Sequence, residues 1–127
     1  MAVGGPQAQR LAAEVADTVN FVMPQTEPRA VTAQRVRAFE QGLDGRDVEF
    51  ALLVPVIGYA VAPFMGSPVT DPVAVREADA LAFPAGDPVA AAEEIHRRRE
   101  ETGFSYFVFG ADVAGPLAPV VAELAGR

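Results

Sequence analysis

The sequence predicts an α/β fold whose parallel sheet is built from four successive β-then-α units. Short apolar runs alternate with amphipathic stretches along the 127 residues, half of which are hydrophobic, and the run VEFALLV at 48–54 is nearly all apolar. Such a run is typical of a strand buried on both faces, and strands separated by helices join through right-handed crossovers into a parallel sheet. Either an open doubly wound sheet or an arc of a (β/α)8 barrel fits this pattern, and both place functional loops at the carboxyl ends of the strands.

The first two units open the chain. Residues 1–3 form a strand end that stops at a diglycine, and Pro6 suits the first turn of the helix that follows. Residues 18–23 (TVNFVM) have the β-branched and aromatic character of a strand. Thr26 is expected to cap a helix that carries Pro28 in its first turn and ends at the segment QGLDG.

The third unit has the weakest pattern. Its strand at 48–54 is followed by a Pro- and Gly-rich stretch at 55–70 without regular periodicity, and a short helix is expected over 72–82. Residues 50–70 carry no charge and are long enough to span a bilayer. Their three prolines break any continuous helix, so a buried strand that runs into a covered loop is the better interpretation.

The fourth unit has the clearest pattern. Asp87 is an expected N-cap for a helix that begins at Pro88 and ends at Gly103. A strand is expected over 104–109, and Pro116 begins a last helix. Its apolar residues recur at i, i+3, i+4 and i+7, namely Leu117, Val120, Val121 and Leu124.

Composition excludes several classes of function. Acidic residues number 17 against 10 basic ones, which gives a net charge of −7 and argues against nucleic acid or a membrane surface as a partner. The absence of cysteine excludes disulfides and thiolate chemistry, and a lone histidine, His96, argues against a metal site. The start of the chain lacks a signal-peptide pattern, so a cytoplasmic location is expected.

A candidate phosphate site lies at Gly4 and Gly5, between the first strand and its helix. Glycines let a phosphate approach the backbone, while the first-turn N–H groups and the helix dipole attract it. Gln7 could add a side-chain donor. A tight turn that binds no ligand explains the same residues, and both interpretations stay open.

Asn20 is the candidate polar residue of the second strand. It alternates with Phe21, so one of the two faces inward and the other faces the helices. An inward Asn could bond a cofactor ring or a substrate, or it could bond a neighbouring backbone group.

The remaining polar residues give weaker evidence for a functional site. His96, beside Glu93 and Glu100, is expected to be solvated or partly buried, and the run Arg97–Arg99 is interpreted as a wet helix face. Asp112 either contacts a ligand hydroxyl or caps a turn. No nucleophile–base set or close acid pair is apparent, so the catalytic residues stay unknown.

Two segments of the chain resemble a known family. Residues 1–21 read MAVGGPQAQRLAAEVADTVNF, and residues 85–127 read AGDPVAAAEEIHRRREETGFSYFVFGADVAGPLAPVVAELAGR. They are similar to two segments of the luciferase-like oxidoreductases, TIM-barrel enzymes that use FMN or the deazaflavin F420. These enzymes often carry V-A-x-G-G-P before a helix that closes with A-D-x-V. Their endings carry G-T/D-P, then G-F/V-x-Y-F-V, then F-A-P-V-V-A-x-L.

The resemblance implies that the chain, 1–127, is a single domain matching the C-terminal half of such a barrel. Four of eight βα units would be present, and a second copy (a homodimer) or a partner subunit would complete the barrel. The implied function is that of an oxidoreductase or monooxygenase that transfers a hydride or uses O2 with F420 or FMN on a small-molecule substrate. The first four strands carry much of the flavin pocket in this family, so no acid or base can be named here.

The resemblance also implies roles for particular residues. Gly4 and Gly5 correspond to backbone donors that hold the cofactor phosphate, with Gln7 beside them, whereas Ala8 lacks the hydroxyl that flavin-using relatives carry. Val22 and Gln25 stand where sugar-phosphate-oxidising relatives carry Thr and Lys, which argues against such a substrate.

The segment at 55–85 matches nothing in the family. Its apolar residues could seal an open edge, which would favour a non-catalytic binding module derived from such a barrel. A truncated product without function is a further alternative.

Overall fold

The main sheet has four parallel strands in the order β1-β2-β3-β7, which is also their order along the chain. The computed structural model describes residues 1–54, 56–57, 60–61, 71–80, 82–83 and 87–125. The strands are β1 (Ala2–Val3), β2 (Thr18–Phe21), β3 (Glu49–Leu53) and β7 (Phe104–Val108). A doubly wound sheet reverses its strand order at a switch point, and the described sheet has no such reversal. The predicted parallel α/β class is confirmed.

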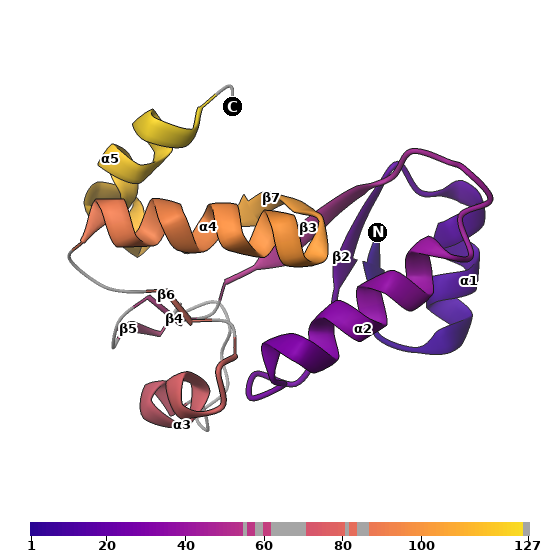
Figure 1. Ribbon diagram of the computed structural model, residues 1–127, viewed down its shortest axis with the longest axis horizontal. Coiled ribbons are helices and arrows are strands. Elements are labelled where there is room, and N and C mark those ends of the chain that lie inside the picture. Colours follow the sequence, from indigo (N-terminus) through magenta and orange to yellow (C-terminus); the bar gives the residue numbers. More distant parts are fainter. Residues whose placement is uncertain (55, 58–59, 62–70, 81, 84–86, 126–127) are drawn as a thin grey trace.

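A helix follows each of these strands. They are α1 (Pro6–Val15), α2 (Arg29–Glu40), α4 (Pro88–Thr102) and α5 (Ala114–Leu124), the last preceded by the short 3-10 helix η2 (Ala111–Val113). Figure 1 shows α2 and α4 in front of the strands, with α1 and α5 at opposite ends of the molecule.

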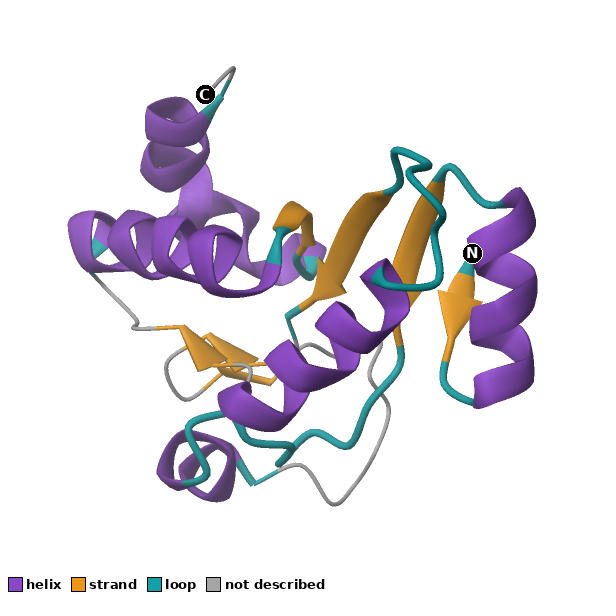
Figure 2. Cartoon of the chain, turned by 45° about the vertical axis from the view of Figure 1, so that its right-hand side comes forward, coloured by secondary structure: helices purple, strands orange, loops and turns teal. Residues whose placement is uncertain are grey.

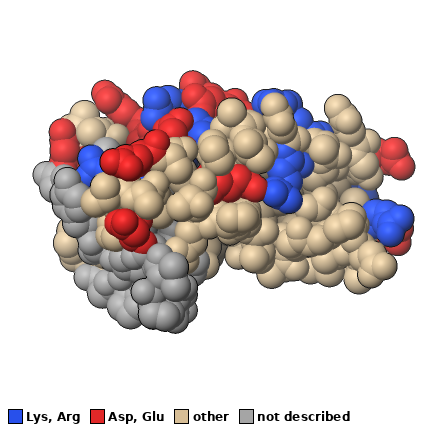
Figure 3. Space-filling model, turned by 90° about the horizontal axis from the view of Figure 1, so that it is seen from below, with Lys and Arg blue, Asp and Glu red and all other residues tan. Residues whose placement is uncertain are grey.

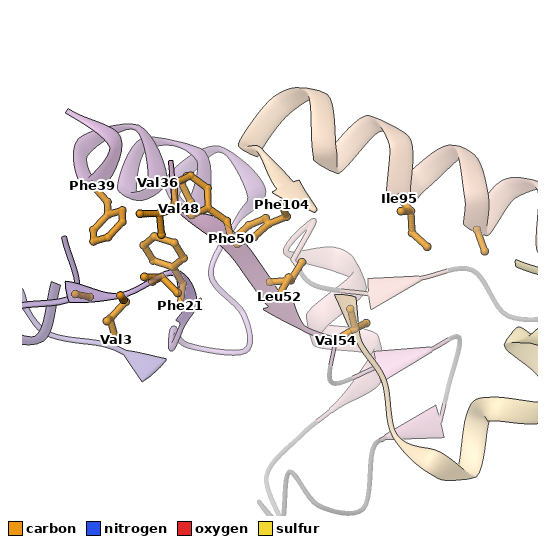
Figure 4. Close-up of a cluster of buried hydrophobic side chains, with 14 of the residues drawn as sticks. Val3, Phe21, Val36, Phe39, Val48, Phe50, Leu52, Val54, Ile95 and Phe104 are labelled. Carbon is orange, nitrogen blue, oxygen red and sulfur yellow. The ribbon is translucent and has the colours of Figure 1, made fainter. Parts of the chain in front are cut away.

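The core fills the space between the sheet and these helices. Phe21 packs edge-on against Phe39 of α2, with ring centroids 5.4 Å apart, and against Phe50 and Phe104 of β3 and β7 at 5.7 and 6.0 Å. Edge-to-face rings of this kind add stabilisation beyond the area they bury. Figure 4 shows this cluster between the strands and α2.

The face of the main sheet away from the phenylalanine cluster carries smaller and more polar side chains. Ala2, Asn20, Ala51 and Tyr106 stand opposite one another on adjacent strands. Because side chains alternate along a strand, Asn20 points away from Phe21, and Ala51 points away from Phe50. On β7 the register shifts between Phe104 and Tyr106, so Tyr106 stands opposite Ala51 although it lies two residues after the buried Phe104. None of the described helices covers this face, and Tyr106 is 54% exposed.

A second, smaller sheet follows β3. It contains β4 (Val56–Ile57), β5 (Ala60–Val61) and β6 (Ala82–Phe83), with β4 parallel to β6 and antiparallel to β5. The sequence pattern gave no sign of these two-residue strands, because so short a run has no detectable alternation. Tyr59, Phe64 and Met65, three of the apolar residues of the 55–85 segment that could seal an open edge, lie outside the described residues.

Several predicted boundaries are wrong. The helix expected over 72–82 is α3 (Pro72–Glu77), and it stops before Asp79, whose φ of 51° is left-handed. Thr26 does not cap α2, because the N-cap is Pro28 and no side chain bonds to that end. The last helix begins at Ala114, two residues before Pro116. Its predicted stripe is buried at Leu117 and Val120, but Val121 is 56% exposed.

The predictions for α4 are confirmed at both ends. The Asp87 side chain accepts hydrogen bonds from the backbone N–H groups of Val89 and Ala90 at 3.0 and 3.2 Å. Gly103 ends the helix with φ of 76°, a conformation that favours glycine. In the part of the chain that the structure describes, no helix has the length and apolar character needed to cross a membrane.

Candidate functional site

Gly4 and Gly5 lie at the carboxyl end of β1, where α1 begins. Gly5 is the N-cap of α1 in an extended conformation (φ −108°, ψ 166°), and no side chain bonds to this helix end. Pro6, which has no N–H, occupies the first turn. The N–H groups of Gln7 and Ala8 therefore have no partner within the helix. This loop is exposed, so these donors face solvent together with the positive end of the helix dipole.

Neither glycine is required by the turn itself. A Cβ built on Gly5 meets no atom within 4 Å, and one built on Gly4 would make ordinary contacts with Val22 at 3.6 and 3.7 Å. Neither residue has a positive φ. The turn therefore needs glycine neither for its conformation nor for space, although glycine is a favoured N-cap residue, which is the position of Gly5. Close approach of a ligand to the backbone is a further reason for glycine here.

The end of β2 lies directly beside this loop. The Val22 N–H donates to the Val3 carbonyl at 2.8 Å, which holds the two strand ends together. The Val22 side chain is 56% exposed and offers no polar group. The loop and the end of β2 thus form one surface whose donors come from the backbone.

Asn20 lies two residues before Val22, on the face of the sheet away from the phenylalanine cluster. Its Oδ1 atom is buried and has no hydrogen-bond partner. A buried acceptor without a partner has a free-energy cost of about 1–3 kcal/mol. The predicted alternation with Phe21 is confirmed, and no group in the described part of the chain donates a hydrogen bond to Oδ1.

The ends of β3 and β7 close the carboxyl edge. The Val54 N–H donates to the Val108 carbonyl at 3.0 Å, and Gly110 is buried just beyond. The side chain of Asp112 lies outside what the structure describes. The strand arrowheads in Figure 2 point toward the side of the molecule that Figure 3 views, where charged side chains gather along the upper part and uncharged ones fill the lower right.

His96 is exposed on α4, as expected for a solvated histidine. This helix belongs to the helix layer, whereas Asn20 lies on the face of the sheet that points away from the phenylalanine cluster. Among the described residues no group of three or more His, Asp or Glu side chains is placed to hold a metal ion. At the carboxyl edge, the hydrogen-bond donors without a partner inside α1 are the N–H groups of its first turn.

A cluster of buried charges that the sequence analysis missed lies elsewhere, between α2 and α4. Glu94 accepts from Arg98 at 2.7 Å and from Arg29 at 2.8 Å, and it also pairs with Arg97. Arg98 is only 3% exposed and donates to the Ala80 carbonyl at 3.0 Å. The interpretation of Arg98 as part of a wet face is wrong. It shares the buried side of α4 with Glu94, one helical turn before it.

Burial alone would raise the pKa of Glu94, but the hydrogen bonds and charges of Arg98, Arg97 and Arg29 outweigh it and hold that pKa below its usual value. Burial lowers the pKa of Arg98, and Glu94 opposes this. The cluster lies among α2, α4 and the residues after α3, so it stabilises the fold. The spacing of Glu94 and Arg98 on one helix was the available signal for it.

No model of a protein family matches the chain, and no curated protein matches it either.

Proposed function

We propose that the chain binds the phosphate-bearing tail of FMN or F420 at the carboxyl edge of its main sheet, as part of a luciferase-like oxidoreductase or monooxygenase. The single observation that carries this proposal is the loop of Gly4 and Gly5. Its two glycines are needed neither for conformation nor for space, and it exposes the first-turn donors of α1.

This loop suits a phosphate through geometry and not through net charge. The exposed N–H groups of Gln7 and Ala8 point along the helix axis, where the dipole favours an anion. The Gln7 side chain is exposed beside them and can add a donor. When bound, the cofactor would supply the hydride transfer or the reaction with O2. The protein would hold its tail, and Asn20 would present an acceptor to a polar group on the other side of the strand ends.

The test is a titration of the purified chain with FMN and F420, with riboflavin as the matched control for FMN, because riboflavin is FMN without the phosphate. Binding of FMN or F420 with riboflavin at least tenfold weaker supports the proposal. Gly5→Asp should raise Kd at least tenfold, because a carboxylate about 4 Å from a phosphate repels it by roughly 1–4 kcal/mol. Gly5→Asn, which has the same shape without the charge, should bind more tightly than Gly5→Asp. No binding at tens of micromolar by the unaltered chain contradicts the proposal.

A second candidate is a non-catalytic binding module derived from such a barrel. The small sheet of β4, β5 and β6 favours it, because this sheet interrupts the regular alternation of strand and helix. This candidate predicts a folded monomer with no affinity for either cofactor.

A further inference from the structure

The main sheet has an unpaired edge at each end and a face without helices. Within the described residues β1 pairs only with β2, and β7 pairs only with β3. We infer that two copies of this chain join about a twofold axis parallel to the strands, with β1 of each copy beside β7 of the other. This arrangement gives an eight-stranded parallel barrel. The inference rests on the proposed function in one respect only, that the barrel would complete the cofactor site.

The twofold axis follows from the strand directions. Rotation about an axis parallel to the strands keeps all strands parallel, and it makes both junctions identical, so that no edge is left open. Pairing β1 with β1 would be antiparallel and would leave both β7 edges unpaired. Eight strands also make a barrel whose interior the inward side chains can fill.

The β1 edge carries exposed apolar side chains. Leu11 and Val15 of α1 are 51% and 61% exposed. The opposite side of α1, with Gln9 and Ala13, lines a cleft shared with Phe39 of α2. Leu11 and Val15 therefore point away from α2, toward the open edge of the sheet.

The β7 edge carries an apolar pocket of about 510 Å³. It is lined by Ser105, Tyr106 and Phe107 of β7, by Leu117, Val121 and Leu124 of α5, and by Ile95, His96 and Arg99 of α4. The pocket therefore lies beside β7, between α4 and α5. No described strand occupies this edge.

The two edges are complementary. In the proposed dimer β1 of one copy lies beside β7 of the other copy. The helix α1 of the first copy then lies against α5 of the second copy. Leu11 and Val15 then meet the apolar side of α5, which includes the exposed Val121.

The dimer also provides an environment for the face without helices. Asn20 and Tyr106 would line the interior of the barrel, where the orphaned Oδ1 atom of Asn20 could find a donor from the other copy or from a ligand. By symmetry each contact occurs twice, so Leu11, Val15 and Val121 of both copies become covered in the assembly.

The test is molar mass in solution, measured by sedimentation equilibrium between about 1 and 100 μM, against 13.3 kDa for one chain. We expect a dimer whose Kd rises at least tenfold in Leu11→Glu and in Val121→Arg. Mixing these two variants should restore dimers, because one of the two junctions then pairs Glu with Arg and the other is unaltered. Val31→Glu, on the exposed side of α2, is the matched control and should leave Kd unchanged.

A monomer throughout the range overturns the inference, as does a dimer that neither edge variant weakens. Circular dichroism of each variant checks that it is folded, and both edge positions are exposed, so folding should persist. Titration of FMN and F420 into the same samples separates the two proposals. A dimer that binds neither cofactor keeps this inference and contradicts the proposed function, whereas a monomer that binds FMN does the reverse.

Discussion

The two faces of the main sheet have opposite characters. The face toward the helices carries Phe21, Phe50 and Phe104, each at most 5% exposed, which pack with Phe39 of α2. The other face carries Asn20 with a buried acceptor that has no partner, and a half-exposed Tyr106. Parallel sheets are normally covered on both faces. The difference indicates that the described core packing lies on the helix side, and the other face is the one that the proposed ligand or second copy would meet.

The largest expected effect is on the helix side. Phe21→Ala should lower the free energy of unfolding by about 3–5 kcal/mol, because it leaves a cavity among three other rings. Tyr106→Ala, on the other face, should lower it by less than about 1 kcal/mol when both are measured by urea denaturation in the Leu11→Glu background. Equal losses at the two positions would show that both faces are equally buried in the single chain.

The next effect concerns the buried charges that join α2 to α4. Glu94→Gln removes the carboxylate that bonds to the buried Arg98 at 2.7 Å, and it should cost about 3 kcal/mol of unfolding free energy. The exposed neighbour Glu93 provides the control, since Glu93→Gln should change stability by no more than about 0.5 kcal/mol. Thermal and urea unfolding of both variants decide the matter. A neutral Glu94→Gln would show that the cluster contributes no stability.

Glu94 should also make the free energy of unfolding depend on pH. The pKa of Glu94 is lower in the folded chain than in the unfolded one, so its ionised form favours folding. Its contribution is complete above the ordinary carboxyl pKa of about 4.3 and is lost as the pH falls through the lower folded value. Urea unfolding between pH 7 and pH 3 should therefore show a smaller acid loss in Glu94→Gln than in the unaltered chain. Identical losses would contradict the assignment.

A smaller effect of opposite sign is expected on the face without helices. Asn20→Val removes the orphaned acceptor and should raise the free energy of unfolding by about 1 kcal/mol in the Leu11→Glu background. The same change should weaken binding of FMN or F420. Thr18→Val is the control on this face, because the Thr18 hydroxyl bonds only to the exposed Glu49, at 3.3 Å. Destabilisation by Asn20→Val would show that Oδ1 has a partner in the free chain.

The smallest effect lies at the start of α1. Gly5→Asp and Gly5→Asn both supply a side-chain cap that Gly5 lacks, and each should raise stability by a few tenths of a kcal/mol. Only Gly5→Asp should then lose phosphate affinity. Loss of stability in both variants would show that the glycine is needed by the turn after all.

The sequence predicted the main sheet well because its signals are local. Asp87, Pro88 and Gly103 mark the ends of α4 by capping chemistry that acts within one turn. The alternation of Asn20 and Phe21 follows from strand geometry alone. The four β-then-α units were found for the same reason.

The features that the sequence did not reveal depend on tertiary contacts. Whether Arg98 is solvated depends on Glu94 and on the distant Ala80 carbonyl, which no local pattern reveals. The strands β4, β5 and β6 have two residues each and are defined only by their pairing. At the candidate site, the sequence shows Gly4 and Gly5 as a motif. Only the structure shows that a side chain would fit at both positions, because this depends on the atoms around them.

The most direct test of the account is amide chemical-shift mapping of the ¹⁵N-labelled chain during titration with FMN and with F420. The account predicts that the amides of Gly5, Gln7 and Ala8 shift most in at least one titration, since they would donate to the phosphate. Riboflavin should leave them in place. Unmoved amides in this loop under both cofactors, or equal shifts with riboflavin, would contradict a phosphate site at the start of α1.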